Sequence, residues 1–439
     1  MGEGKKTTAT KSTEAAKRVP VMIRGLLEEA RNAHKEGKFI AYTLIDTIYD
    51  EVVEAMDIVG EFVENYAGVC AAKQDAQRFF DKAHSEGFSS ELCSYLRCSV
   101  GFDAMREETG KMPADAPWGG LVKPDMMLGS SMAVCDVRVK SFQAAQQYMP
   151  EVPVYLNSNL WPHYEDDIDF REIQDYYVKY NTEELRRFVR FLEEQTGKKM
   201  DWDRLSEIVD LTDKIWDLFY EIGQLRKAVP CPMGAEDHMT NMVPCQFMMA
   251  RKGIYEFYKD LYAEVKYKVD NKIGIVPEEK YRLLMEGGPP WYALNTYDYF
   301  KKYGAVFVAE RAYNLQLPIE LLDIPKVSDP LEHIAWRKFK FTVYWHDAAR
   351  RLGCCPDVAR WIEQIDDYKI DGIVQFRNYS CRAFNLCTFT YLDMVKRYRD
   401  IPSLLIEGDL ADINFYSEAD THSRIDNFIE ILDRSKRGK

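Results

Sequence analysis

Short apolar segments alternate with helix-like segments along most of this 439-residue chain, and no other feature constrains its fold as strongly. Each apolar run is followed by residues with helical spacing. Alternation of this kind implies parallel strands joined by crossover helices. The strands are expected at 39–42, 126–128, 152–156, 282–285, 305–308, 371–376 and 403–406.

The alternation stops between about residues 167 and 269, where apolar residues recur at helical spacing instead. A first helix is expected around Leu185 and Leu192, with Asn181 or Thr182 as its N-cap and Gly197 as its stop. A second helix is expected from 205 to 219, and a third from 245 to 269. The chain therefore carries a helical block between two α/β regions.

These patterns predict an α/β fold with two doubly wound parallel-sheet domains around a cleft and an intervening helical block. The length exceeds what one hydrophobic core usually serves. The two α/β regions are similar in style, which suggests a pseudo-symmetric pair. The expected parts are a disordered N-terminal tail and lead-in helix at 1–35, a first α/β domain at 36–160, the helical block at 161–275 and a second α/β domain at 276–439.

The formal net charge of −13 argues against a nucleic-acid partner, because such a partner needs a basic surface. No apolar run approaches the roughly 18 residues that a membrane span needs. The polar start of the chain has no signal-peptide core. The ten cysteines are therefore expected to be reduced thiols of a cytoplasmic protein, not a disulfide framework.

Three of the cysteines occupy candidate ligand positions. Cys135 and Cys381 each follow a strand-like run and precede a helix-like one, at the sheet edge where open α/β folds bind ligands. Cys93 lies in the segment Leu92-Cys93-Ser94-Tyr95. Helix N-termini favour thiolates, and three converging thiols would suit an iron–sulfur cluster with one iron left open.

The spacing of these cysteines leaves other interpretations open. Cys93, Cys135 and Cys381 are separated by 42 and 246 residues, which matches no local ferredoxin or zinc pattern. Free cysteine is among the most buried residue types, so each is also compatible with a core position. Cys98 would crowd a site at Cys93. A weaker candidate is a zinc corner made by His346, Cys354 and Cys355. Cys70 and Cys387 are expected to pack in the core, and Cys231 and Cys245 in the core or an interface.

Two further segments are expected at a sheet edge. Glu51 begins the first crossover helix, either as an ordinary helix-start charge or as a proton donor or base in the cleft. The segment Glu286-Gly287-Gly288-Pro289-Pro290-Trp291 follows a strand. Its glycines either allow a ligand to approach the backbone or form a rigid turn with Trp291 in the core. No phosphate loop is found, so any ATP hydrolysis is expected on another polypeptide.

At these residues the chain resembles the 2-hydroxyacyl-CoA dehydratase and benzoyl-CoA reductase superfamily. In overall look it is most similar to the longer cluster-bearing subunit of ATP-dependent benzoyl-CoA reductases. The departures are Leu96, where relatives often have glycine, and the extra Cys98. The matching segments, in chain order, are Cys93-Ser94-Tyr95-Leu96-Arg97, Val134-Cys135-Asp136, Arg377-Asn378-Tyr379-Ser380-Cys381 and Ile406-Glu407-Gly408-Asp409.

The resemblance implies one 4Fe–4S cluster, held by cysteines that match Cys93, Cys135 and Cys381, with the fourth iron left to a small non-protein ligand or to substrate. It also implies a heterodimer of two related cluster-bearing subunits and a separate ATP-hydrolysing activator. Glu51 aligns with a glutamate found in the active sites of some relatives. The leading hypothesis is a benzoyl-CoA reductase subunit, in which ATP and ferredoxin drive the two-electron dearomatisation of an aromatic acyl-CoA, benzoyl-CoA, to a cyclic dienoyl-CoA.

Two alternatives belong to other classes. One is a subunit of a 2-hydroxyacyl-CoA dehydratase, in which one recycled electron drives radical loss of water through a ketyl intermediate. The other is a non-catalytic scaffold whose cysteines are ordinary core residues. A reductase consumes electrons in every turnover and a dehydratase only for priming, whereas a scaffold contains no iron.

Overall fold

The computed structural model describes residues 7–45, 47–130, 135–162, 169–249, 251–311 and 317–437. Within these ranges the strands form two four-stranded sheets in which every neighbouring pair is parallel. The first sheet consists of β1 (Phe39–Thr43), β2 (Ile58–Phe62), β3 (Met126–Ser130) and β4 (Val154–Asn157). The second consists of β5 (Tyr281–Glu286), β6 (Ala305–Glu310), β7 (Gly372–Asn378) and β8 (Ser403–Gly408).

The two sheets share one topology. The first has the strand order β2-β1-β3-β4, and the second has the corresponding order β6-β5-β7-β8. The predicted fold class and the pseudo-symmetry of the two α/β regions are therefore confirmed. In each sheet the strand order reverses beside the first strand, between β1 and β3 in one sheet and between β5 and β7 in the other. Ligands of doubly wound folds bind at this reversal, outside the carboxyl ends of the strands.

The strands are continuous apolar runs because both faces of each sheet are covered. In β5, Leu283 and Met285 belong to the cluster formed with α11 (Thr296–Lys301) and α17 (Glu418–Arg437). Leu284, between them, points to the opposite face and its cluster. That face is covered by α14 (Pro356–Asp367), α16 (Thr388–Tyr398) and the end of α13 (Pro330–Leu352).

The first sheet is covered in the same way. One face packs against α3 (Val63–Ala72), α4 (Ala76–Ser85), α5 (Ser94–Thr109) and α6 (Asp136–Ala145). The other packs against α2 (Asp50–Ala55), α7 (Phe170–Thr196) and α8 (Trp202–Leu225). The helix α1 (Glu14–Asn32) lies on the first face, over Ile40 and Val59, in a cluster with α9 (Ala235–Phe247) and α10 (Ile254–Asp270). The helical block comprises α7 to α10. The short elements are α12 (Ile319–Leu322), α15 (Arg382–Asn385), η1 (Ala33–Glu36), η2 (Pro117–Gly119), η3 (Trp291–Ala293) and η4 (Ile413–Phe415).

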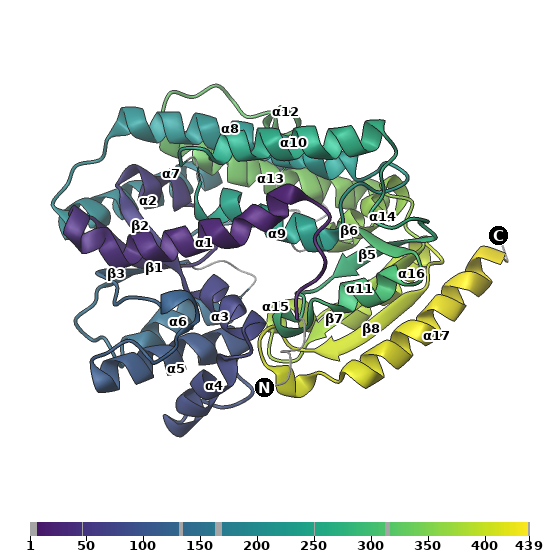
Figure 1. Ribbon diagram of the computed structural model, residues 1–439. Coiled ribbons are helices and arrows are strands. Elements are labelled where there is room, and N and C mark those ends of the chain that lie inside the picture. The colour runs from purple at the N-terminus through teal and green to yellow at the C-terminus, as the bar shows by residue number, and fades with distance from the viewer. Residues whose placement is uncertain are drawn as a thin grey trace.

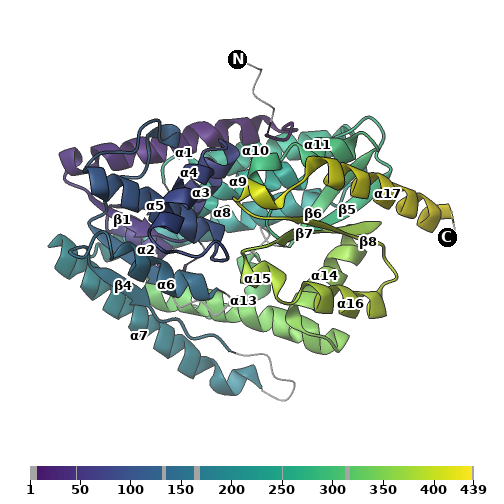
Figure 2. The same ribbon diagram turned by 90° about the horizontal axis from the view of Figure 1, so that it is seen from below.

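The helical block connects the two lobes. Figure 1 shows the two sheets side by side, with α8 and α10 running across above them. Figure 2, seen from below, shows α7 and α13 along one side of the molecule and α1 and α10 along the other. Phe170 and Val178 of α7 share an apolar cluster with Trp336 and Phe339 of α13, so a helix from the second half of the chain joins the block.

Three details differ from the expectations drawn from sequence. The first helix of the block begins at Phe170 with Asp169 as its N-cap, not at Asn181 or Thr182. Asn181 lies buried within the helix, where its side chain exchanges two hydrogen bonds with the backbone of Leu160. The expected helix at 245–269 is two helices, α9 and α10, and β2 was not expected.

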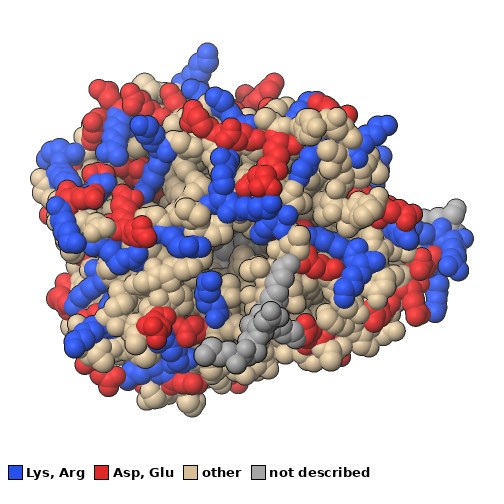
Figure 3. All heavy atoms as spheres, viewed as in Figure 1, with Lys and Arg blue, Asp and Glu red and all other residues tan. Residues whose placement is uncertain are grey.

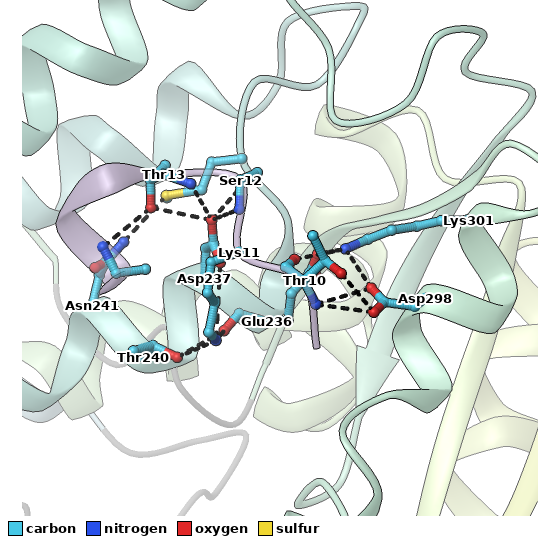
Figure 4. A network of polar contacts seen from close by, with 12 residues as sticks. Thr10, Lys11, Ser12, Thr13, Glu236, Asp237, Thr240, Asn241, Asp298 and Lys301 are labelled. Carbon is cyan, nitrogen blue, oxygen red and sulfur yellow. Dashed lines mark hydrogen bonds and ion pairs between the residues drawn. The ribbon is translucent and has the colours of Figure 1, made fainter. Parts of the chain in front are cut away.

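The segment of residues 7–13, named here the N-terminal strap, is ordered by hydrogen bonds. The backbone N–H groups and hydroxyls of Ser12 and Thr13 donate to one oxygen of buried Asp237 on α9, over 2.6–3.1 Å. Thr10 donates to Asp298 on α11 (Figure 4). Residues 1–6 of the expected tail, and Val134 of the matching segments, lie outside the described residues.

Acidic and basic side chains are interspersed on the face shown in Figure 3, and the surface is hollowed between the two lobes. Across the described ranges, no helix combines the length and the apolar character that crossing a membrane requires.

Candidate functional site

Each of the three predicted cysteines is the residue that immediately precedes a helix. Cys93 is the N-cap of α5, Cys135 of α6 and Cys381 of α15. Cys135 and Cys381 follow β3 and β7, which hold the same place in the two sheets. The pseudo-symmetry of the fold therefore gives these two thiols equivalent positions, at the topological switch point of each lobe.

The three thiols are close enough to influence one another electrostatically. Burial raises the pKa of the Cys93 thiol well above its ordinary value, and the nearby Cys381 and Cys135 raise it further. Burial likewise raises the pKa of Cys381 to about 11, with a contribution from Cys135. The pKa of Cys135 is also raised by burial. In the metal-free protein all three side chains are therefore neutral thiols near pH 7.

Main-chain N–H groups oppose this effect at each sulfur. Those of Tyr95 and Leu96 act on Cys93 and lower its pKa. The first turns of α6 and α15 act in the same way on the pKa values of Cys135 and Cys381. The unpaired N–H groups of a helix start favour a negative charge. Each thiol is thus placed where its thiolate form would be stabilised once a metal replaced the proton.

Hydrogen bonds join the residues that flank the thiols, across the boundary between the lobes. The backbone N–H of Ser94 in the first lobe donates to Oγ of Ser380 in the second, at 2.9 Å. Arg382 donates to Asp136 at 2.7 Å, which connects the neighbours of Cys381 and Cys135. Both bonds link loops far apart in the sequence, so the convergence of the thiols depends on the packing of the two lobes.

A carboxylate beneath the Cys381 turn extends this arrangement. Asp409, fully buried after β8, accepts hydrogen bonds from the backbone N–H and the hydroxyl of Ser380 at 2.7 and 2.6 Å. Its other oxygen accepts from the backbone N–H groups of Ala411 and Asp412 at 3.2 and 3.3 Å. The Asp412 side chain is in turn paired with Arg97 of α5 at 2.8 Å, and both side chains are 5% exposed.

The glycine-rich segment after β5 forms a rigid turn and packs against the strand that leads to Cys381. Gly287 has φ +81°, and a Cβ on it would lie 2.1 Å from the carbonyl oxygen of Phe376. Gly288 exchanges two hydrogen bonds with the Asn378 side chain, at 3.0 and 2.8 Å. Trp291, half-buried, donates from its indole N–H to the hydroxyl of Tyr95 in the other lobe. The close approach that needs glycine here is made by the protein's own backbone.

Glu51 lies at the start of α2, as expected, but in a buried ion pair. Its carboxylate is bonded to Arg337 of α13, and each side chain is only 2% exposed. Arg337 is also paired with Asp213 of α8 at 2.6 Å. Glu51 thus ties the first lobe to the helical block, and its proposed role as an acid or base is not tested by this geometry.

The other cysteines that the sequence offered as metal ligands lie in separate surroundings. Cys98 does not crowd Cys93, because it is buried in a thiol hydrogen bond with Cys70 of α3. Cys354 is buried and Cys355 caps α14. Throughout the part of the chain that the structure describes, no group of three or more His, Cys, Asp or Glu side chains is arranged to hold a single metal ion. Of the cysteines expected in the core, Cys70, Cys231 and Cys245 are buried, whereas Cys387 is half-buried.

Comparison with protein-family models places most of the chain in one family. Residues 48–432 match the family described as 2-hydroxyglutaryl-CoA dehydratase, D-component. The chain belongs to this family. The match begins after β1 and extends from β2 to β8, over Cys93, Cys135 and Cys381, so it includes the whole candidate site.

Individual relatives are distant but collinear with the chain. The alpha subunit of (R)-2-hydroxyisocaproyl-CoA dehydratase from Clostridioides difficile is 24% identical, over 96% of this chain and 98% of its own length. The B-type polypeptide of benzoyl-CoA reductase from Thauera aromatica is also 24% identical, over 95% and 94%. The alpha subunit of (R)-2-hydroxyglutaryl-CoA dehydratase from Acidaminococcus fermentans is 20% identical, over 95% and 97%. The resemblance stated from sequence motifs is confirmed, and the chain is a relative of enzyme subunits.

Sequence reasoning found the thiols but not the groups that hold them. Ser380, Asp409 and Arg97 all lie within the motif segments. No local pattern reveals that Ser380 contacts Asp409 or that Arg97 contacts Asp412. Their partners, Ser94 and Asp412, lie 286 and 315 residues away from Ser380 and Arg97 respectively. Only the packing of the lobes brings these groups into contact.

Proposed function

We propose that this chain is the iron–sulfur subunit of an acyl-CoA enzyme, with Cys93, Cys135 and Cys381 as the ligands of one 4Fe–4S cluster. The observation that carries the proposal is that three helix-start thiols, drawn from both lobes, meet at the switch points of the sheets. Among the described residues, the thiols do not converge on one metal ion. A cluster of four irons is larger than one ion, so its ligands need not converge on a single point.

When bound, such a cluster supplies one-electron transfer and one iron open to a small ligand or a thioester carbonyl. The N–H groups at the starts of α5, α6 and α15 lower the pKa values of the three thiols and so favour the thiolates that would bind the cluster. Cys93, Cys135 and Cys381 are each half-buried, so the protein shields the sulfurs from part of the surrounding water. Electron transfer to a conjugated thioester benefits from such shielding, because fixed protein groups can then stabilise the charge that develops.

The specific reaction that we propose is that of a benzoyl-CoA reductase: ATP-driven, ferredoxin-dependent two-electron reduction of benzoyl-CoA to a cyclic dienoyl-CoA. The similarity to the Thauera reductase polypeptide over nearly the full length supports it. The partners would be a related cluster-bearing subunit, an ATP-hydrolysing activator and ferredoxin, in the cytoplasm. The relatives are named as subunits of larger enzymes, which supports the first of these partners.

A second candidate is a 2-hydroxyacyl-CoA dehydratase subunit. The family description and the dehydratase alpha subunits among the relatives favour it, and the identity of 24% is the same for both reactions. The complex purified with its partner subunit and activator separates them. A reductase takes up two electrons from reduced ferredoxin for each benzoyl-CoA consumed, whereas a dehydratase releases water from a 2-hydroxyacyl-CoA with electrons needed only for priming. Absence of electron uptake with benzoyl-CoA and close aromatic analogues would exclude the reductase.

The ligand assignment is tested by iron analysis after anaerobic reconstitution. Cys381→Ser is expected to lower the iron and sulfide content well below that of the wild type, because a cluster thiolate is lost. Cys70→Ser is the matched control, since Cys70 is buried in α3 and hydrogen-bonded to Cys98. Equal iron in the two variants would contradict the assignment, and a colourless, iron-free wild type would point to the scaffold alternative.

A further inference from the structure

The residues next to two of the three thiols are connected by a continuous chain of hydrogen bonds, named here the Asp409 relay. The Ser380 hydroxyl donates to Asp409 at 2.6 Å, and the oxygen of that hydroxyl accepts the backbone N–H of Ser94 at 2.9 Å. Ser94 follows Cys93 and Ser380 precedes Cys381. Asp409 and Ser94 are fully buried and Ser380 is 6% exposed, so water does not compete for these bonds.

The relay replaces a cap that α5 lacks. Ser94 is the first residue of α5, and its N-cap, Cys93, makes no side-chain cap hydrogen bond with the described residues. The first N–H groups of a helix have no partner within the helix. At Ser94 this partner comes from the opposite lobe, through a hydroxyl that is itself oriented by a carboxylate. The start of the helix at Cys93 is thereby fixed relative to the Cys381 turn.

The backbone around Ser380 is held by the same carboxylate. Asp409 accepts the Ser380 backbone N–H at 2.7 Å in addition to the hydroxyl. Its second oxygen accepts two backbone N–H groups of its own loop. These bonds fix the carboxylate in its loop and orient the turn before Cys381. Hydrogen bonds to a carboxylate are stronger than those between neutral groups.

We propose that Asp409 is a positioning residue that acts through the Ser380 hydroxyl and the Ser94 N–H to set the separation of Cys93 and Cys381 across the lobe boundary. Asp409 is not itself a ligand of the cluster, and it acts by fixing two loops at once. As a role toward the cluster, this inference rests on the proposed function. As a statement about the distance between the two loops, it is independent of any metal.

Substitutions at Ser94 and Ser380 test the relay. Ser94→Pro removes the N–H donor at the first position of a helix, where proline is otherwise well tolerated, and its ring Cδ would displace the Ser380 hydroxyl that the N–H now contacts. Ser94→Ala is the matched control, because the Ser94 hydroxyl has no hydrogen-bond partner among the described residues while its N–H is retained. Ser380→Ala removes the middle of the relay, and Ser380→Thr restores its hydroxyl.

The first measurement is the rate at which each cysteine of the metal-free protein reacts with a small maleimide, followed peptide by peptide by mass spectrometry. Ser94→Pro and Ser380→Ala are expected to speed the labelling of Cys93 and Cys381 by about tenfold, the effect of losing a buried hydrogen bond. Cys355 and Cys387, which are also half-buried, are expected to keep their rates. Ser94→Ala and Ser380→Thr are expected to behave as the wild type.

The second measurement is iron retention by the reconstituted protein against a chelator, with the same ranking of variants expected. The relay is overturned if Ser94→Ala is as damaging as Ser94→Pro, or if Ser380→Ala leaves the labelling of Cys93 and Cys381 unchanged. Faster labelling of all cysteines alike would indicate general unfolding and would also overturn it. A wild type that binds no iron would defeat the proposed function, whereas the labelling rates would still decide the relay.

Discussion

At the scale of single residues, the buried charges of this chain are held in place by partners from distant elements. Arg337 of α13 binds Glu51 of α2 and Asp213 of α8, and its guanidinium lies 4.3 Å from the centre of the Trp216 ring. Burial lowers the pKa of the Arg337 guanidinium, but the two carboxylates outweigh this effect and raise it overall. Arg337 is therefore charged in the folded protein.

Replacing Glu51 is expected to cost stability whether or not the residue takes part in catalysis. Glu51→Gln should lower the free energy of unfolding by about 3 kcal/mol, because a buried guanidinium loses one of its two carboxylates. Adding Arg337→Met should recover part of that loss, since the buried guanidinium is then gone and Asp213 keeps its hydrogen bond with His333. Denaturant unfolding of the two single variants and the double variant measures the coupling. Losses that simply add would contradict a direct interaction between the two side chains.

The sequence predicted the positions of the candidate residues in the fold better than it predicted their surroundings. The positions of Cys135 and Cys381 follow from a local pattern, a strand followed by a helix, and the structure places both at helix starts. The local pattern around Glu51 was also read correctly as a helix start. Its partner Arg337 lies 286 residues away, and no periodicity records that contact.

At the scale of elements, β2 is a short strand that the sequence pattern did not predict, and it carries a buried glutamate. It follows α2 closely and lies at the edge of its sheet, paired only with β1 among the described strands. Long helices and central strands repeat their pattern several times, whereas five residues with a glycine and a glutamate do not. The start of α7 was predicted too late in the chain for a related reason. Asn181 is a residue type typical of an N-cap, but its side chain is hydrogen-bonded to the backbone of Leu160.

The glutamate of β2 is expected to make stability depend on pH. Glu61 is 1% exposed, one of its oxygens accepts the backbone N–H of Val122, and the other has no hydrogen-bond partner among the described residues. Burial raises the pKa of Glu61 to about 8, Asp103 adds to this, and Arg106 and Arg31 oppose it. Because the folded pKa lies above the unfolded one, the folded state retains a proton that the unfolded state loses. Stability should therefore decrease as pH rises from about 4.5 towards 8.

Glu61→Gln is expected to remove this dependence. The amide keeps the acceptor for Val122 and carries no charge, so the variant should gain on the wild type by at most about 1.4 kcal/mol for each pH unit in that window. Thermal unfolding of both metal-free proteins at about pH 5.5, 7 and 8.5 gives the difference. Glu28→Gln, on the exposed side of α1, serves as the control. Parallel pH profiles for wild type and Glu61→Gln would show that Glu61 ionises as easily in the folded chain as in the unfolded one.

At the scale of the whole molecule, two similar lobes depend on connections that cross between them. The candidate site lies at one such junction, since its thiols come from both lobes. The N-terminal strap forms another. Thr7 donates to the carbonyl of Ala72 in the first lobe at 3.2 Å, and its own carbonyl accepts the N–H of Asn295 in the second at 3.1 Å. Chain connectivity alone would not hold the lobes in one arrangement.

Asp237 is the main attachment of the strap, and its loss is expected to weaken the junction. Asp237→Asn replaces a carboxylate that accepts from four donors with an amide that itself donates, so about 2 kcal/mol of stability should be lost. Hydrogen exchange should increase in residues 10–13, in α9 and at the Ala72 end of α3. The matched control is Asp260→Asn, which removes a surface pair with Arg18 that is 64% exposed at the aspartate and contributes little.

Deleting residues 1–12 tests whether the strap acts on the junction or only on α9. If it connects the lobes, the deletion should speed exchange on both sides of the boundary, at the end of α3 and at Asn295, and should raise the labelling rates of Cys93 and Cys381 together. The reason is that both thiol loops meet across the same boundary. Faster exchange confined to α9, with unchanged labelling of the two cysteines, would show that the strap stabilises one helix and leaves the relative position of the lobes to the helical block.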